Sequence, residues 1–250
     1  MPDNVYSAIY LAPHLDDIPL SCGGQVHKRT QAGEKVLALT IMAGEPPPGP
    51  LSEFAQLLHG RWQLAADVVT RRRAEDVAAC ARLGVDWQHW PVPDCVYRQD
   101  EAGTWLYPEW TAVIDTIHPV DRTLINDLAA RLRRLPPAKR IIAPLGVGGH
   151  VDHQITRLAA AKAFSHRLWY YEDYPYVAEP DALSAVIPPD SDDWQATAVA
   201  LTDANIQAKI EAIAAYESQL SSFFNGRDDL VHKIHAAAQE AQGERLWQRP

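Results

Sequence analysis

The chain has 250 residues, of which 47% are apolar and 22% are charged, a balance that argues against disorder and allows one substantial hydrophobic core. The formal charge of −9 repels phosphate backbones and anionic membranes, so nucleic acid is not an expected partner. The three cysteines, Cys22, Cys80 and Cys95, form no Cys-x-x-Cys pair, which argues against a disulfide framework and suits a reducing compartment.

The amino-terminal apolar run, from Val5 to Pro13, has no basic region ahead of it. It is too short for a signal peptide of the usual build or for a membrane span. We therefore expect a cytoplasmic protein without a membrane-spanning segment.

Apolar runs typical of buried strands alternate with helical segments along the chain. Strands are expected at residues 9–12, 35–42, 85–92, 140–145 and 168–171. Helices are expected at residues 18–31, 71–83, 124–135, 152–164 and 205–220. This alternation indicates a mostly parallel sheet with helices on both faces. The prediction is a single Rossmann-like α/β domain over residues 1–250. Two segments rich in Pro, Asp, Trp and Tyr, 95–120 and 175–204, are expected to be surface excursions that shape a substrate pocket.

Side chains that can bind metal follow two of the predicted strands. His14, Asp16 and Asp17 come after the first strand, and His150 and His153 come after the fourth. The carboxyl ends of parallel strands lie on one rim of the sheet, where ligands bind. We therefore expect both groups to meet at that rim.

A catalytic zinc ion takes three nitrogen or oxygen ligands and leaves one position open for water. His14 and Asp17, three residues apart on one predicted helical face, and His153 supply such a set. Asp16 remains beside the metal as a carboxylate that can take a proton from the bound water. His150 is expected to polarise the scissile carbonyl group and to help the leaving amine depart.

Each cluster alone has a simpler explanation. Asp16 or Asp17 alone would be an ordinary helix N-cap, and a lone His-x-x-His is usually a pair of surface histidines. The conjunction of both clusters on one predicted rim favours a metal site.

The same residues resemble the PIG-L/LmbE deacetylase family. The resemblance rests on the runs Ala12 to Asp17 and Gly149 to His153, and weaker matches extend to about residue 220. Leu15 stands where the family usually has proline. The resemblance implies a Zn²⁺-dependent hydrolase that removes an N-acyl group, with acetyl expected, from an amino sugar or a similar small molecule. Residues 221–250 lie outside it.

The resemblance also implies roles for individual residues. The implied zinc ligands are His14, Asp17 and His153, with Asp16 as the general base and His150 facing the carbonyl oxygen. Arg72 aligns with an arginine that contacts the sugar in some members, although Arg71-Arg72-Arg73 by itself would be a solvated helix face. Asp94 follows the third predicted strand, and it is expected to bind a substrate hydroxyl, with a loop cap as the alternative.

Two other classes of protein stay open. A catalytically silent protein of the same fold would bind metal and sugar without turnover, but it would have no use for Asp16 and His150. A nucleotide-binding enzyme is disfavoured because the run Gly146 to Gly149 is neither Gly-x-Gly-x-x-Gly nor a Walker sequence. The acidic chain and polar rim favour a small, soluble, hydroxyl-rich substrate. The oligomeric state is left open, a homo-oligomer included.

Overall fold

The computed structural model describes residues 5–62, 67–164 and 168–249. Within these residues, seven strands form one sheet in the order β3-β2-β1-β4-β5-β7-β6. The strands are β1 (Ala8–Ala12), β2 (Val36–Thr40), β3 (Asp86–His89), β4 (Ile141–Pro144), β5 (Leu168–Tyr171), β6 (Gln195–Val199) and β7 (Glu244–Gln248). Strands β1 to β5 are parallel, and β7 is antiparallel to both of its neighbours. The predicted single-domain α/β fold with a mostly parallel sheet is confirmed.

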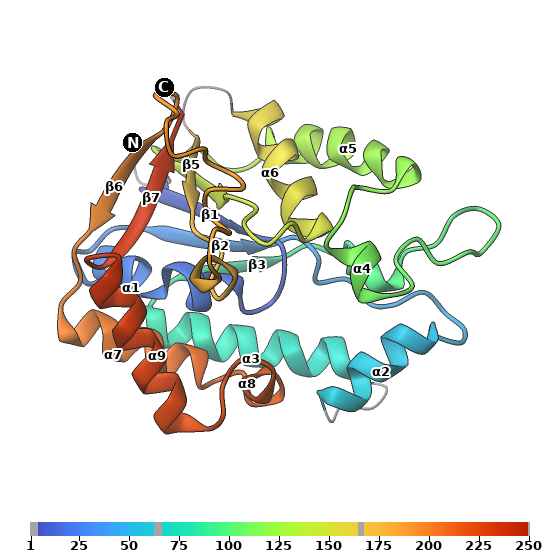
Figure 1. The fold of residues 1–250 in the computed structure, drawn as a ribbon, viewed down its shortest axis with the longest axis horizontal. Coiled ribbons are helices and arrows are strands. Elements are labelled where there is room, and N and C mark those ends of the chain that lie inside the picture. Colours follow the sequence, from blue (N-terminus) through green and yellow to red (C-terminus); the bar gives the residue numbers. More distant parts are fainter. Residues whose placement is uncertain (1–4, 63–66, 165–167, 250) are drawn as a thin grey trace.

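Helices cover both faces of this sheet (Figure 1). The helices α5 and α6 pack together on one face, whereas α1, α3 and α7 lie on the other. The helices are α1 (Asp17–Gln31), α2 (Glu53–Arg61), α3 (Val68–Leu83), α4 (Trp110–Val113), α5 (Arg122–Leu132), α6 (Val151–Ala163), α7 (Asp203–Ile213), α8 (Glu217–Phe223) and α9 (Arg227–Glu240), with the 3₁₀ turns η1 (Cys95–Tyr97), η2 (Pro119–Asp121) and η3 (Tyr176–Ala178). In the described ranges, none of these helices has the length and apolar character needed to cross a membrane.

Alternate residues of β1 pack against opposite helical layers. Ile9 and Leu11 share a cluster with Leu128 of α5 and Ile155 of α6. Tyr10 points to the other side, into the cluster that contains residues of α1 and α3. Every residue of β1 is buried, because both faces of the sheet are covered. This burial explains the continuous apolar run in the sequence.

The helix predicted over residues 205–220 is wrong, because the chain forms two helices there, α7 and α8. Carboxylates of α3 bind the chain at the break. The hydroxyl of Tyr216 donates to Asp76 Oδ1 at 2.6 Å. The backbone N–H and the hydroxyl of Ser218 both donate to Glu75, at 3.0 and 2.6 Å. These tertiary hydrogen bonds satisfy polar groups at the break, including one backbone N–H at the start of α8.

The segment 221–250, outside the resemblance, contributes to the fold. Its strand β7 lies between β5 and β6 in the sheet. Glu244, at the start of β7, accepts hydrogen bonds from the backbone N–H groups of Gly24 (3.0 Å) and Gln25 (2.8 Å). These amides follow Cys22, where α1 departs from helical geometry. The carboxylate thus acts as an N-terminal cap for the second half of α1.

Candidate active site

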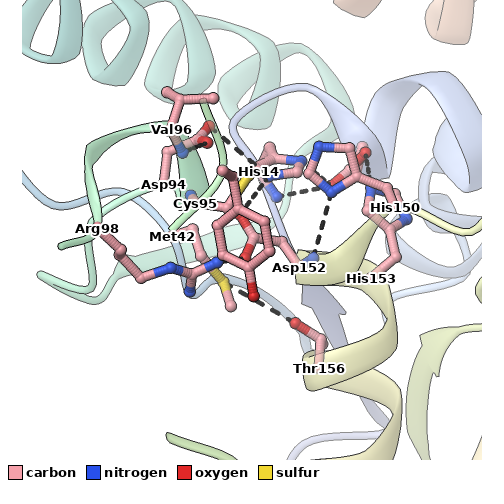
Figure 2. Close-up of polar contacts among 12 residues, drawn as sticks. His14, Met42, Asp94, Cys95, Val96, Arg98, His150, Asp152, His153 and Thr156 are labelled. Atoms are coloured by element: carbon pink, nitrogen blue, oxygen red, sulfur yellow. Dashed lines mark hydrogen bonds and ion pairs between the residues drawn. The ribbon is translucent and has the colours of Figure 1, made fainter. Parts of the chain in front are cut away.

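The predicted site lies where the strand order of the sheet reverses. Strands β1 and β4 are neighbours, but the chain continues from β1 to β2 on one side and from β4 to β5 on the other. Such a switch point forms a crevice beyond the carboxyl ends of the two strands, where ligands bind. Figure 2 shows the result: His14, which follows β1, lies beside His150 and His153, which follow β4.

The backbone at Asp16 is in the left-handed region, with φ 120°. This conformation is rare for a residue other than glycine and costs free energy. Residues in such conformations cluster at functional sites, where the surrounding structure holds them in place. Asp16 occupies the N-cap position of α1, but its side chain makes no capping hydrogen bond. The carboxylate of Asp16 faces Arg72 instead, with Asp16 Oδ2 3.5 Å from Arg72 Nη2. The same Nη2 donates a hydrogen bond to the backbone carbonyl of Leu15 at 2.9 Å. The N-cap explanation therefore does not account for Asp16.

His14 and Asp17 are close for a reason other than the predicted one. His14 precedes α1, so the two residues do not share a helical face. The backbone N–H of His14 donates to Asp17 Oδ2 at 2.6 Å, which closes a tight turn. His14 Nδ1 lies 3.7 Å from Asp17 Oδ2, and His153 Nε2 lies 3.5 Å from Asp17 Oδ1.

These three side chains fit a metal ion. Tetrahedral zinc with bonds of about 2.0–2.1 Å separates its ligand atoms by roughly 3.3 Å. The distances of 3.5 and 3.7 Å between the carboxylate of Asp17 and the nitrogens of His153 and His14 need only a small inward adjustment. The rings of His14 and His153 have centroids 5.3 Å apart, as expected for two histidines on one ion.

The other nitrogen of each histidine faces a buried carboxylate. His14 Nε2 lies 3.0 Å from Asp152 Oδ2, and His153 Nδ1 lies 2.6 Å from Asp173 Oδ1. Both aspartates are 0% exposed. Carboxylates in this position fix the orientation of a metal-binding ring and increase its basicity. Sequence reasoning missed both, although Asp152 stands inside the second motif and Asp173 follows β5 on the same rim.

The same cluster offers alternative ligand sets. Three groups in the described part of the chain have ligand atoms within 4.8 Å of one another: His14–His150–His153, Cys95–His150–Asp152 and His14–Asp94–Asp152. All three lie in this cluster, so it could hold a metal ion. The second group is disfavoured, because burial raises the pKa of the Cys95 thiol well above its ordinary value and Asp152 is paired with the guanidinium of Arg98.

His150 begins α6 as its N-cap, and its Nδ1 accepts the backbone N–H of Asp152 at 3.2 Å. Burial, together with the nearby charge of His14, holds the pKa of His150 well below the ordinary value for histidine. The ring is therefore neutral near pH 7. A neutral ring whose Nδ1 accepts a hydrogen bond carries its proton on Nε2, so His150 can donate from that atom.

Burial also changes the acidity of Asp16. It raises the pKa of Asp16 to about 7; the charges of Arg72 and His14 act in the opposite direction, and that of Asp17 adds to the rise. A carboxylate with a raised pKa is a better proton acceptor near neutral pH than an ordinary one.

The cluster opens into a cavity of about 350 Å³. Every residue that the sequence analysis assigned to the site lines it: His14, Asp16, Asp17, Arg72, Asp94, His150 and His153. The two surface excursions contribute to its wall through Val96, Trp110 and Val113 from residues 95–120, and through Pro175, Tyr176 and Glu179 from residues 175–204.

The two residues predicted to bind substrate, Arg72 and Asp94, have different surroundings. Arg72 is only 8% exposed, and its guanidinium lies 4.9 Å from the ring centroid of Trp62, so the solvated helix face is wrong for this residue. Asp94 both caps and faces the site. Its Oδ1 accepts the backbone N–H of Val96 at 3.2 Å, and its Oδ2 lies 3.7 Å from His14 Nε2.

Comparisons of the sequence and of the fold with known proteins both find similarity to deacetylases. The sequence family described as PIG-L: GlcNAc-PI de-N-acetylase matches residues 9–164. The 2'-N-acetylparomamine deacetylase of Niallia circulans is 23% identical over 262 residues, which cover 96% of this chain and 89% of that protein. The zinc-inhibited form of teicoplanin deacetylase Orf2 superposes with a TM-score of 0.82 at 29% identity, covering 97% of this chain and 98% of that one. The A40926 pseudoaglycone deacetylase Dbv21 gives a TM-score of 0.74 at 27% identity, with 96% of each chain covered.

Proposed function

The chain belongs to the PIG-L family of de-N-acetylases, and on this premise we propose that it hydrolyses the N-acetyl group of an amino sugar with zinc as its metal. The observation that carries the proposal is the arrangement around Asp17. Two histidine nitrogens lie 3.5 and 3.7 Å from its carboxylate, and an aspartate and a histidine without a ligand role, Asp16 and His150, line the same cavity.

We assign the metal to His14 Nδ1, His153 Nε2 and the carboxylate of Asp17. The opposite nitrogens of the two rings face Asp152 and Asp173, which supports this ligand set over the alternatives. Bound zinc would supply Lewis acidity, which makes water a nucleophile at neutral pH and polarises the acyl oxygen.

Asp16 is proposed to accept the proton of the attacking water. Asp16 lines the cavity without a proposed ligand role, so its carboxylate is free to hold that proton and then to deliver it to the departing amine nitrogen. His150 is proposed to donate from Nε2 to the oxygen that becomes negative in the tetrahedral intermediate. The products are acetate and a free amine.

Arg72 and Asp94 are proposed to bind the sugar. Both line the cavity beside the metal ligands, and both can form hydrogen bonds with hydroxyl groups. The relatives described as deacetylases of 2'-N-acetylparomamine and teicoplanin support an N-acetylated amino sugar as the substrate class. We also propose the cytoplasm as the compartment, since the three cysteines are free and buried.

The alternative is a silent metal- and sugar-binding protein, and Asp16→Asn separates the two. Acetate release from N-acetylated amino-sugar glycosides would be measured beside zinc content by elemental analysis. The variant should keep its zinc and lose turnover by about 10²–10⁴-fold. The matched control is Asp127→Asn, on the exposed surface of α5, which should behave as the unchanged protein. Zinc binding without acetate release from any such glycoside by the unchanged protein would favour the silent alternative.

A further inference from the structure

One part of the cavity wall is apolar, which differs from the polar rim expected from the sequence. The wall includes Leu58, Trp62, Trp110, Val113 and Phe223. Leu58 lies in α2, Trp110 and Val113 lie in α4, and Phe223 ends α8. The three proposed metal ligands, His14, Asp17 and His153, come instead from the segments after β1 and β4. The cavity is therefore lined by the polar side chains of the proposed metal site and by apolar side chains from α2, α4 and α8.

One residue of the apolar wall, Trp110, is also exposed at the surface. Trp110 is 47% exposed, and its ring contacts that of Phe54 edge to face, with centroids 5.4 Å apart. This contact joins α4 to α2, which Figure 1 shows on the same side of the molecule. Leu57 and Ile114, next to residues of the wall, are also exposed large apolar side chains. Of these three exposed residues, Trp110 also lines the cavity, so an aromatic ring is available to a ligand at its mouth.

The cavity is also larger than an acetamido group alone would fill. Its volume of about 350 Å³ lies in the range of sites that enclose a drug-sized ligand, about 300–1,000 Å³. A ligand with its acetamido group at the metal would place further atoms against the apolar wall. Arg61 and Gln219 also line the cavity, and they can form hydrogen bonds with polar substituents of a ligand.

We infer that the substrate is a glycoside whose aglycone is apolar and aromatic, and that this aglycone binds against Trp62, Trp110 and Phe223. The inference rests on the proposed function only for the orientation, which places the N-acetylated sugar at the metal. Aromatic rings gain from burial against aromatic walls both by leaving water and by edge or offset contacts. A free sugar would leave this wall facing water.

The test compares phenyl and methyl glycosides of N-acetylglucosamine, both anomers of each, in calorimetric binding to zinc-loaded protein that carries Asp16→Asn in every variant, because this substitution should prevent hydrolysis during the titration. The phenyl glycoside should bind about tenfold more tightly or better. Trp110→Ala and Phe223→Ala should each reduce this preference and leave the affinity for the methyl glycoside unchanged. The matched control is Trp87→Ala, since Trp87 is 48% exposed and lies on the edge strand β3. It should keep the full preference.

Acetate release from the same glycosides by the unchanged protein separates the two proposals. Equal affinity for phenyl and methyl glycosides overturns the inference, and release of acetate from both would leave the proposed function standing. A preference for phenyl that depends on Trp110, without acetate release from either compound, supports the aglycone site and contradicts the proposed function. A preference lost equally in Trp87→Ala also overturns the inference.

Discussion

The guanidinium of Arg98 is paired with the carboxylate of Asp152, and both groups are buried beside the proposed metal ligand His14. Burial alone would raise the pKa of Asp152, but Arg98 and then His14 hold it well below its usual range. Asp152 is therefore an anion that faces Nε2 of His14 at 3.0 Å. An N–H at Nε2 leaves Nδ1 free to bind metal. The pair connects the excursion 95–120 to a proposed zinc ligand.

Asp152→Asn should weaken zinc binding by about 10–100-fold. An amide cannot supply the negative charge that stabilises the N–H of His14 and increases the basicity of its ring. Competition with a chromophoric chelator measures the dissociation constant directly, without reference to activity. Asp127→Asn, on the surface of α5, serves as the control. Unchanged zinc affinity in Asp152→Asn would mean that His14 does not depend on this carboxylate.

Arg98→Met should lower the free energy of unfolding by about 3–5 kcal/mol, because it leaves buried carboxylates without a counter-charge. Besides Asp152, these include Asp121, whose Oδ2 lies 3.1 Å from Arg98 Nε. Urea denaturation of the metal-free protein measures the loss. Arg134→Met, at an exposed position, should change stability by less than about 0.5 kcal/mol. A similar small change in Arg98→Met would contradict a structural role for this network.

Asp17→Ala should lose zinc at ordinary metal concentrations and regain part of its activity with excess zinc. The substitution removes the carboxylate that lies between His14 and His153. Titration of the variant with zinc, followed by acetate release, gives the concentration needed for half of the recovered rate. Full activity at the zinc concentration that saturates the unchanged protein would remove Asp17 from the ligand set.

His150→Ala should keep zinc at normal stoichiometry and reduce kcat by about 10²–10³-fold, the usual effect of removing one donor to an oxyanion. The loss should fall mainly on kcat, because the hydrogen bond strengthens as the oxygen becomes negative. Steady-state kinetics beside elemental analysis checks both parts. If the variant instead lost its metal, the grouping of His150 with His14 and His153 would be the better ligand set.

The parallel part of the sheet and the meeting of the two motifs could be predicted from the sequence. Strands β1, β2 and β4 are buried throughout, so each leaves a continuous apolar run. Since parallel strands end on one rim, the positions of His14 and His153 followed from the order of strands and helices. Strand β6 was missed because most of its residues are exposed, and β7 was missed because its pairing with β5 and β6 depends on distant chain segments.

Other features depend on contacts that spacing does not encode. The directions of the two histidine rings, and with them the roles of Asp152 and Asp173, follow from tertiary packing. The break between α7 and α8 depends on hydrogen bonds to α3, from Tyr216 to Asp76 and from Ser218 to Glu75. The apolar wall of the cavity combines α2, α4 and α8, which lie far apart in the sequence.

The hydrogen bonds of Glu244 to Gly24 and Gln25 join positions 220 and 219 residues apart. They complete α1, whose first residue is Asp17. On the ribosome, this helix can acquire its full set of partners only after β7 has been synthesised. Pairings between such distant segments form slowly, because a long loop must close first. Binding of the proposed metal ion should therefore follow folding of the sheet, and a nascent chain that lacks β7 should bind metal poorly.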